Sequence, residues 1–188
     1  MIWLSVTDAC PIVHIWLLNP GDASWLRDSG VRLIVPDTVE GELRGQGERR
    51  SRPAQRSLPG VQGLSLLETW GVTDQKRYDL EFSDLERVHN LRVRYKIGQG
   101  EATAIAVGEK LDLPVLTNDQ AALEAVKAEL GAEKGVTLLA LVLRAFKKGL
   151  VDRHWISMAS RRLAANYESA ALWPRDLEQY ANTLRLTW

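Results

Sequence analysis

Short apolar runs that alternate with helical patterns constrain this chain most strongly. The runs Ile2 to Val6 and Pro114 to Thr117 are short and apolar, and a helical pattern follows each of them closely. Such runs predict buried β-strands. Val31 to Val35 is β-branched and is stopped by Pro36, which predicts another strand. Strands that alternate with helices form a parallel sheet covered by helices on both faces, so the sequence predicts an α/β fold.

The other elements follow from apolar spacing, capping residues and helix breakers. A strand is expected at Leu64 to Leu67, and Gly135 is expected to open a short link before an apolar helix. The segment from Gly45 to Gly63, rich in Gly, Arg, Ser, Pro and Gln, is expected to be a loop. The predicted helices cover 11–18, 22–28, a segment that begins at Asp37 or Thr38, 84–95, 102–111, 120–130, 137–146, and two segments within 152–188 that separate near Trp173 and Pro174.

Length and composition fit one folded domain. A chain of 188 residues can bury a core without disulfides or a structural metal. Hydrophobic residues make up 45% and charged residues 26%, as in globular proteins. Cys10 is the single cysteine, the apolar runs are too short to span a bilayer, and no basic region precedes a signal-like core. We therefore expect a cytoplasmic protein without a membrane segment.

Charge is balanced overall but uneven along the chain. The 24 basic and 24 acidic residues cancel, so the net charge indicates no polyanionic partner. Basic side chains gather locally, however, and such segments can contact phosphates; a solvated loop is the equal alternative for the first segment. The two basic segments contain Arg44, Arg49, Arg50, Arg52 and Arg56, and then Arg87, Arg92, Arg94 and Lys96.

Four acidic residues are expected at one edge of the sheet. Asp8 and Asp119 directly follow predicted strands, while Glu42 and Glu101 stand near the starts of other helices. Taken one at a time, each position has a structural explanation. Asp8 and Asp119 stand where a helix N-cap is expected, and Glu101 lies in a first helical turn, where the helix dipole favours an anion. Capping does not explain why acids recur at the edge where open α/β sheets bind ligands. We therefore expect the four side chains to share a site.

A cluster of carboxylates suits a divalent cation. Mg²⁺ and Mn²⁺ prefer oxygen ligands, and Mg²⁺ commonly binds substrate phosphate at the same time. Such an ion makes water a competent nucleophile and stabilises the leaving oxygen of a phosphodiester. Without it, carboxylates crowded together repel and raise one or more pKa values.

Other site chemistries are not indicated. His14, His89 and His154 lack metal-ligand spacing, and Cys10 lacks the cysteine partners of a zinc site, so we assign all four to structure. The chain has no phosphate-binding Gly-Lys-Ser/Thr loop, dinucleotide fingerprint or nucleophile elbow.

Four motifs follow one another along the chain. They are Val6-Thr7-Asp8, then Val35-Pro36-Asp37-Thr38-Val39-Glu40-Gly41-Glu42-Leu43, then Gly98-Gln99-Gly100-Glu101-Ala102-Thr103-Ala104-Ile105-Ala106, then Val115-Leu116-Thr117-Asn118-Asp119. Their order resembles the PIN-domain nucleases, nearest to the prokaryotic branch with VapC-type toxins and uncharacterised relatives. The passage from Gly135 to Leu139, with Lys148 to Val151, looks like the closing strand-to-helix passage of that family. The resemblance covers about residues 2 to 151.

The resemblance implies a Rossmann-like three-layer α/β/α sandwich with a central, mainly parallel sheet. A PIN-like nuclease domain would span 1–151, with the Arg-rich excursion near 44–63. The segment 152–188 would be a C-terminal helical extension packed on the same domain.

The resemblance also implies an endoribonuclease that uses Mg²⁺ or Mn²⁺ to hydrolyse RNA with water as the nucleophile. The catalytic metal ligands would be Asp8, Glu42, Glu101 and Asp119, with Glu40 as a competitor for the role of Glu42. Possible partners are RNA, a small antitoxin protein and a second copy in a homodimer. Substrate contacts would come from Thr7, Thr117, Asn118, Arg44, Arg49, Arg50 and Arg52.

Two departures leave alternatives open. Many relatives have an acid where this chain has Asn118, and some have another shortly after Asp119, where 120–122 are Gln, Ala and Ala. One metal would then be held firmly and a second only with substrate. The alternative is a PIN-fold module that binds RNA or protein without cutting. A further alternative is a phosphohydrolase with Asp8 as the nucleophile, although Cys10 stands where such enzymes have a second Asp.

Overall fold

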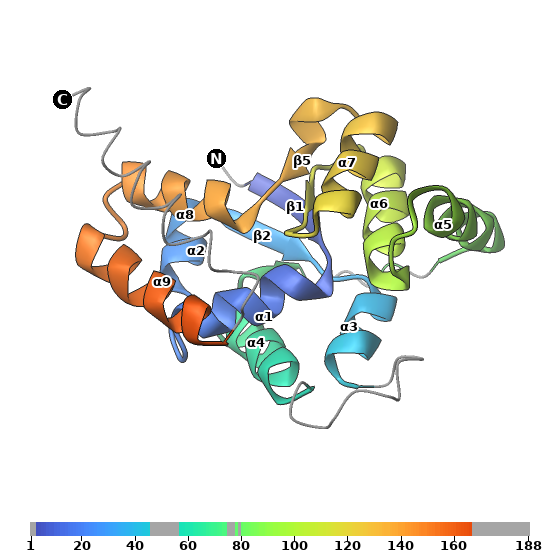
Figure 1. Ribbon diagram of the computed structural model, residues 1–188. Helices are drawn as coiled ribbons and strands as arrows, with labels where there is room; N and C mark the ends of the chain where they lie inside the picture. The colour runs from blue at the N-terminus through green and yellow to red at the C-terminus, as the bar shows by residue number, and fades with distance from the viewer. Residues whose placement is uncertain (1–2, 46–56, 75–77, 79, 167–188) are drawn as a thin grey trace.

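A parallel sheet forms the centre of the molecule (Figure 1). The computed structural model describes residues 3–45, 57–74, 78 and 80–166. Within these residues the sheet has five strands in the order β3-β2-β1-β4-β5, and every neighbouring pair is parallel. This confirms the predicted α/β class. The strands are β1 (Trp3–Thr7), β2 (Val31–Ile34), β3 (Thr73–Asp74), β4 (Val115–Leu116) and β5 (Gly135–Val136).

Helices occupy most of the connections between the strands, largely where apolar spacing predicts them. The predicted N-caps Asp8 and Asp119 are both confirmed, and each accepts a hydrogen bond from a backbone N–H in the first turn of its helix. The helices are α1 (Ala9–Leu18), α2 (Ser24–Ser29), α3 (Asp37–Leu43), α4 (Ser57–Thr69), α5 (Phe82–Tyr95), α6 (Gln99–Leu111), α7 (Gln120–Glu129), the 3₁₀ helix η2 (Ala132–Lys134), α8 (Leu138–Lys147) and α9 (Arg153–Asn166).

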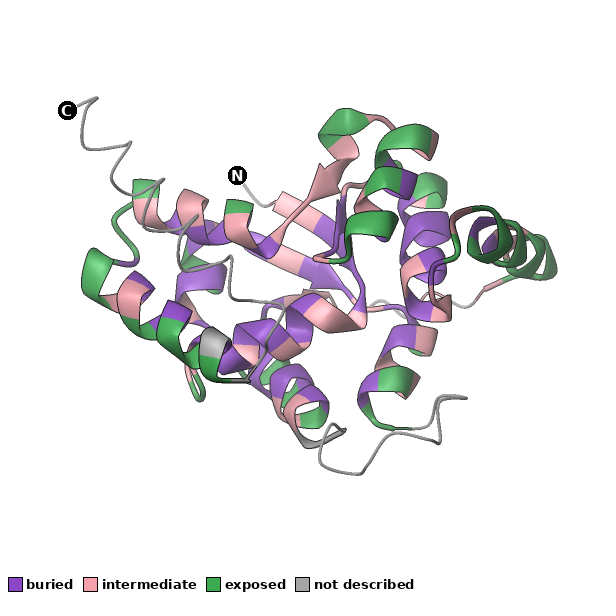
Figure 2. Cartoon of the chain, in the orientation of Figure 1, coloured by how far each residue is buried: buried purple, intermediate pink, exposed green. Residues whose placement is uncertain are grey.

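Two apolar clusters cover the opposite faces of the sheet. Because side chains alternate along a strand, Leu33 of β2 joins one cluster while Ile34 joins the other. The first cluster includes buried side chains of α1, α2, α4, α8 and α9, and the second includes those of α5, α6 and α7. The helices therefore lie on both sides of the sheet, an arrangement compatible with a three-layer α/β/α fold (Figure 2).

The prediction of a strand at Leu64 to Leu67 is wrong. These residues lie in helix α4, and Leu64 and Leu67 are both buried in the first cluster. A short apolar run does not distinguish a strand from a buried helical turn, and here helix packing decides. A Cβ built on Gly63 would lie 2.7 Å from the Ile12 carbonyl oxygen of α1, so the glycine lets the two helices approach closely.

The prediction of a loop at 45–63 is wrong for residues 57–63, which belong to α4. Residues 46–56, with most of the arginines of that segment, lie outside the described residues. Two strands were not predicted as such. Strand β3 consists of Thr73 and Asp74, and β5 occupies the expected link at Gly135. Neither strand has an apolar run long enough to be recognised as a strand in the sequence.

Helix α9 packs on the same side of the sheet as α1 and α2. The rings of Trp25 in α2 and Trp155 in α9 have centroids 5.4 Å apart. The Arg162 guanidinium donates a hydrogen bond to the Leu18 carbonyl oxygen at 3.1 Å. The second predicted C-terminal helix lies beyond residue 166, outside the described residues. Among the helices that are described, none has the length and apolar character needed to cross a bilayer.

Charged side chains join α5 to α6 and α7 on the other side. Glu129 is only 12% exposed, and it accepts from Arg87 at 2.7 Å, from Arg94 at 2.8 Å and from the Tyr95 hydroxyl. Arg87 also pairs with Glu109 at 2.8 Å. Two arginines of the second basic segment are therefore part of helix packing.

Candidate active site at the sheet switch point

The strand order reverses direction between β1 and β4. From β1 the chain moves outward through β2 and β3, and it then returns to place β4 and β5 on the opposite side of β1. In open α/β sheets, ligands bind beyond the carboxyl ends of the strands at such a switch point. Asp8 follows β1 directly and Asp119 follows β4 after two residues, so both acids lie at this position. The Asp8 N–H donates to the Leu116 carbonyl oxygen at 3.2 Å, which ties the two strand ends together.

Asp8 is a buried acid with half of its carboxyl group unpaired. The residue is 1% exposed, and its Oδ1 accepts from the Cys10 N–H at 2.9 Å. Its Oδ2 is buried and has no hydrogen-bond partner by distance and angle among the described residues. An unpaired buried polar atom costs about 1–3 kcal/mol, so this oxygen requires a partner of another kind.

The environment of Asp8 favours the protonated acid. Burial, together with the negative charges of Glu101 and Asp119, raises the pKa of Asp8 to about 8. The Thr117 hydroxyl, which lies near the carboxyl group, and the Cys10 N–H act in the opposite direction. The effect of Glu101 and Asp119 shows that these two acids lie close enough to act on Asp8 electrostatically.

Glu42 reaches the same edge from α3. Its Oε1 accepts from the Gly100 N–H in the first turn of α6 at 3.1 Å. A Cβ built on Gly100 would lie 2.5 Å from Glu42 Oε2, and one built on Gly98 would collide with the Glu101 carboxylate. The two glycines of the Gly-Gln-Gly-Glu segment therefore leave room for two carboxylates, a role that the sequence analysis did not assign to them.

The structure separates Glu42 from its competitor Glu40. Glu40 lies in α3, and its Oε1 pairs at 2.8 Å with Arg44, the residue just after the helix. Glu42 instead bonds α6, beside Glu101. The position of Glu42 thus agrees with its assignment to the acidic group, while Glu40 belongs to a local surface pair.

The four acids share an edge but are not assembled into a closed ligand set. Among the described residues, no three His, Cys, Asp or Glu side chains are grouped closely enough to hold a metal ion as they stand. Three of the four carboxylates are engaged by backbone N–H groups, from Cys10 to Asp8, from Gly100 to Glu42 and from Ala122 to Asp119.

The donor set nevertheless fits a hard divalent cation. The group offers carboxylate oxygens, which Mg²⁺ and Mn²⁺ prefer, and it includes the unpaired Oδ2 of Asp8. A cation beside these acids would offset their mutual repulsion and favour the ionised form of Asp8. Asp8, Glu42, Glu101 and Asp119 are the residues that would hold it.

Thr7, Thr117 and Asn118, which were predicted to contact the substrate, lie at the carboxyl edge of the sheet and make hydrogen bonds within the protein. Thr7 and Thr117 are buried, and Thr117 Oγ1 accepts from the Asp119 N–H at 3.1 Å. Asn118 Oδ1 accepts from the Leu138 N–H at 3.0 Å, and its amide nitrogen lies 2.8 Å from His14 Nδ1. Asn118 therefore connects the end of β4 with α8 and α1, a structural role that the sequence analysis did not foresee.

His14 and Cys10 are neighbours of the acidic group. Burial lowers the pKa of His14 to about 4, so its imidazole is neutral near pH 7. Cys10 Sγ lies 3.7 Å from His14 Nε2, and burial together with the nearby acids raises the pKa of the thiol. A neutral thiol beside a neutral imidazole agrees with the structural role predicted for both.

Of the four predicted phosphate-binding arginines, Arg44 is the one that the described residues include. It is exposed at the end of α3 and pairs with Glu40. Arg49, Arg50 and Arg52 lie outside the described residues.

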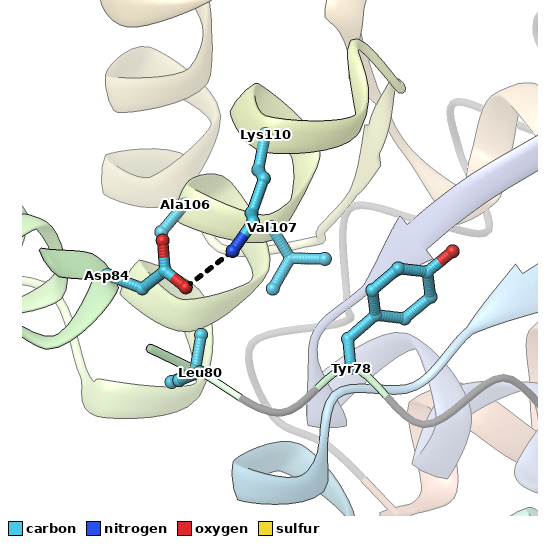
Figure 3. Close-up of a pocket in the computed structure, with 6 residues that line it drawn as sticks. All are labelled: Tyr78, Leu80, Asp84, Ala106, Val107 and Lys110. Atoms are coloured by element: carbon cyan, nitrogen blue, oxygen red, sulfur yellow. Dashed lines mark hydrogen bonds and ion pairs between the residues drawn. The ribbon is translucent and has the colours of Figure 1, made fainter. Parts of the chain in front are cut away.

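Two concave surfaces lie elsewhere on the molecule. A small pocket between α5 and α6 is crossed by the ion pair of Lys110 with Asp84 at 2.9 Å (Figure 3). A wider groove lies between Trp3 and one face of α8. Neither includes any of the four acids. The lining residues are Tyr78, Leu80, Asp84, Ala106, Val107 and Lys110 for the pocket, and Trp3, Val136, Ala140, Leu141, Leu143, Arg144, Lys147 and Lys148 for the groove.

Comparison of the chain with protein-family models and with curated proteins finds no match. The functional argument therefore depends on the residues at the switch point.

Proposed function

We propose that this protein is a PIN-like, divalent-metal-dependent endoribonuclease. One observation carries the proposal: at the switch point the charges of Glu101 and Asp119 act on Asp8, whose buried Oδ2 has no hydrogen-bond partner among the described residues. Glu42 bonds the first turn of α6, which also carries Glu101. Helix capping explains one oxygen of Asp8 and leaves Oδ2 without a hydrogen bond of good geometry among the described residues. A ligand that attracts carboxylates explains both the convergence and the unpaired atom.

The reaction follows from the division of roles among the residues. Asp8, Glu42, Glu101 and Asp119 would hold Mg²⁺ or Mn²⁺, and Asp8 would then bind in its ionised form. When bound, the cation lowers the pKa of a water molecule and stabilises negative charge on the leaving oxygen of a phosphodiester. Thr117 and Asn118 keep the end of β4 in place through their hydrogen bonds.

The RNA backbone would be positioned by cations near the site. Arg44 stands just after α3, the element that carries Glu42, and its side chain is 41% exposed although it pairs with Glu40. Contacts to phosphate orient a nucleic acid without reading its sequence. Arg49, Arg50 and Arg52, close to Arg44 in the chain, are proposed to extend this contact.

A module that binds RNA without cutting it is the second candidate. It is favoured by the backbone hydrogen bonds that already engage Asp8, Glu42 and Asp119, and by Asn118, whose amide is used in packing. Such a module would bind RNA with an affinity that falls steeply with salt, because phosphate contacts release counterions.

A phosphoaspartate mechanism is less well supported. Asp8 is 1% exposed, so its carboxylate is poorly accessible for attack on a phosphate ester. Position 10, two residues on, carries a partly buried thiol whose pKa is raised.

Cleavage of single-stranded and structured RNA by the purified protein, with Mg²⁺, Mn²⁺ or EDTA, tests the proposal. The Asp8→Asn variant is expected to lose at least about 100-fold in rate, a loss of the size found when an essential catalytic interaction is removed. Asn preserves the N-cap of α1, so the fold is retained. Glu40→Gln is the matched control, because Glu40 lies in the same helix as Glu42 but pairs with Arg44.

Each outcome separates the candidates. Metal-dependent cleavage that survives Glu40→Gln and is lost in Asp8→Asn supports the nuclease. RNA binding without cleavage in either metal, by protein shown to be folded, replaces the nuclease with the binding module.

A further inference from the structure

Helix α5 has a second apolar face on its solvent side. Val88 and Leu91 are buried against the rest of the molecule, which accounts for the first face. Phe82, Leu85 and Val93 are exposed at 86%, 49% and 65%. Figure 2 shows α5 at the right-hand end of the molecule, with most of its turns coloured as exposed.

The three exposed apolar residues and the exposed His89 form a line along the helix. Phe82, Leu85, His89 and Val93 are separated by three, four and four residues, and such spacing places side chains on one face. We call these four residues the outer stripe of α5. A surface helix of a globular protein normally has a polar outer face, so an apolar outer stripe indicates a face that is covered in the functional state.

Charges along α5 are divided between its two halves. The exposed acids Glu81 and Glu86 stand at the N-terminal end, and the exposed cations Arg92, Arg94 and Lys96 stand at the C-terminal end. Glu81 remains 74% exposed and Arg94 69% exposed despite their ion pairs with Lys110 and Glu129. The helix surface therefore carries opposite charges at its two ends, with apolar side chains between them.

This pattern is complementary to itself when it is reversed. If a second α5 lies antiparallel across the outer stripe, its basic end faces the acidic end of the first helix. A parallel arrangement would place like charges together, which is unfavourable. An interface with two-fold symmetry requires one patch to complement its own copy, and the outer stripe meets this requirement.

We propose that the outer stripe of α5 binds the same stripe of a second copy of this chain, with the helices antiparallel and the two-fold axis near His89. The proposal names the surface of a homodimer and does not rest on the nuclease function. The helix has 14 residues and is about 20 Å long, so the contact is small. Interfaces below about 1,200 Å² are typical of weak complexes, so the dimer forms at high protein concentration.

Sedimentation velocity over a concentration series from about 1 µM to about 1 mM tests the surface, a range that covers weak association. The wild-type chain is expected to shift from monomer to dimer. Phe82→Glu and Val93→Glu are expected to remain monomeric at every concentration, because each places a charge in the stripe. Leu150→Glu is the matched control, since Leu150 is an exposed apolar residue (37%) outside α5. Circular dichroism checks that all variants are folded.

Oxidative cross-linking tests the antiparallel orientation. In His89→Cys the two thiols would meet at the axis and form a disulfide-linked dimer. In Phe82→Cys the two positions would lie about 21 Å apart along the helices, too far to link. The wild-type chain, whose single cysteine is Cys10, measures the background.

A wild-type chain that stays monomeric throughout the series overturns the proposal. So does a dimer that survives both glutamate substitutions. Linkage at position 82 as well as position 89 overturns the antiparallel arrangement.

Discussion

Asp8 combines a structural and a chemical role in one carboxyl group. Its Oδ1 caps α1, while its buried Oδ2 has no hydrogen-bond partner among the described residues. The residue therefore stabilises the helix start but adds a buried group whose charged form is disfavoured. A buried carboxyl group whose pKa is strongly raised is a candidate for a functional site.

The raised pKa of Asp8 predicts how stability depends on pH. In the unfolded chain the carboxyl group ionises near 3.8, and in the fold near 8. The folded state therefore binds the proton more tightly, so the contribution of this group is fully present below about pH 4 and is lost as the pH rises towards 8. In EDTA, we expect Asp8→Asn to be more stable than the wild type at pH 8 by more than about 1 kcal/mol, because the neutral amide avoids the free-energy cost of a buried acid whose pKa is raised above its unfolded value.

Urea unfolding at pH 5 and pH 8, with and without Mn²⁺, measures this difference. The advantage of Asp8→Asn is expected to shrink at pH 5, and added Mn²⁺ should stabilise the wild type alone. Equal stability of the two proteins at pH 8 would contradict the assignment of an unpaired buried acid.

The Gly100→Ala variant tests whether the Glu42 carboxylate, which bonds α6, belongs to the site. In Gly100→Ala the new methyl group would lie 2.5 Å from Glu42 Oε2, so the flexible Glu42 side chain must move. We expect a clear loss of metal-dependent RNA cleavage with a stability change below about 1 kcal/mol, because alanine also favours the helix. Gly41→Ala is the control, since nothing lies within 4 Å of its added Cβ; it should keep activity. Cleavage rates that are equal in the two variants would remove Glu42 from the site.

At the scale of elements, α4 shows how packing overrides local sequence. Leu64 to Leu67 is short and apolar, as a strand would be, yet it forms part of a helix that packs on α1. Gly63 permits this contact, because an added Cβ would lie 2.7 Å from the Ile12 carbonyl oxygen of α1. Gly60 likewise permits the contact of α4 with α3, where an added Cβ would lie 2.9 Å from the Leu43 carbonyl oxygen. The information that decides between helix and strand is therefore in the neighbouring helices.

Gly63→Ala tests the close approach of α4 and α1. The atom nearest to the added methyl group is the Ile12 carbonyl oxygen, a backbone atom that cannot rotate away, so the helices must separate. Overpacking of this kind costs about 1–3 kcal/mol, and we expect a loss of stability in that range by urea unfolding. In Gly41→Ala, where space is open, helix propensity should instead leave stability unchanged or raise it by about 0.5–1 kcal/mol. A Gly63→Ala variant as stable as the wild type would show that α1 and α4 do not pack in this way.

At the scale of the whole molecule, the carboxyl edge of the sheet was predictable and its detail was not. Asp8 and Asp119 each follow a short apolar run and precede a helical pattern, so their place at one edge follows from the α/β topology. The partners of Glu42 and Asn118 could not be predicted, because they depend on contacts between α3 and α6 and between β4, α1 and α8. Strands β3 and β5 have two residues each, too few to leave a periodic pattern.

Binding of Mn²⁺ is the most direct test that the four acids form a cation site. Electron paramagnetic resonance or calorimetry on the wild type, Asp8→Asn and Glu40→Gln would measure it. The wild type and Glu40→Gln are expected to bind Mn²⁺ with the same stoichiometry, while Asp8→Asn binds at least about 10-fold more weakly, a loss of about 1.4 kcal/mol. Failure of the folded wild type to bind Mn²⁺, or binding unchanged by Asp8→Asn, would contradict the account.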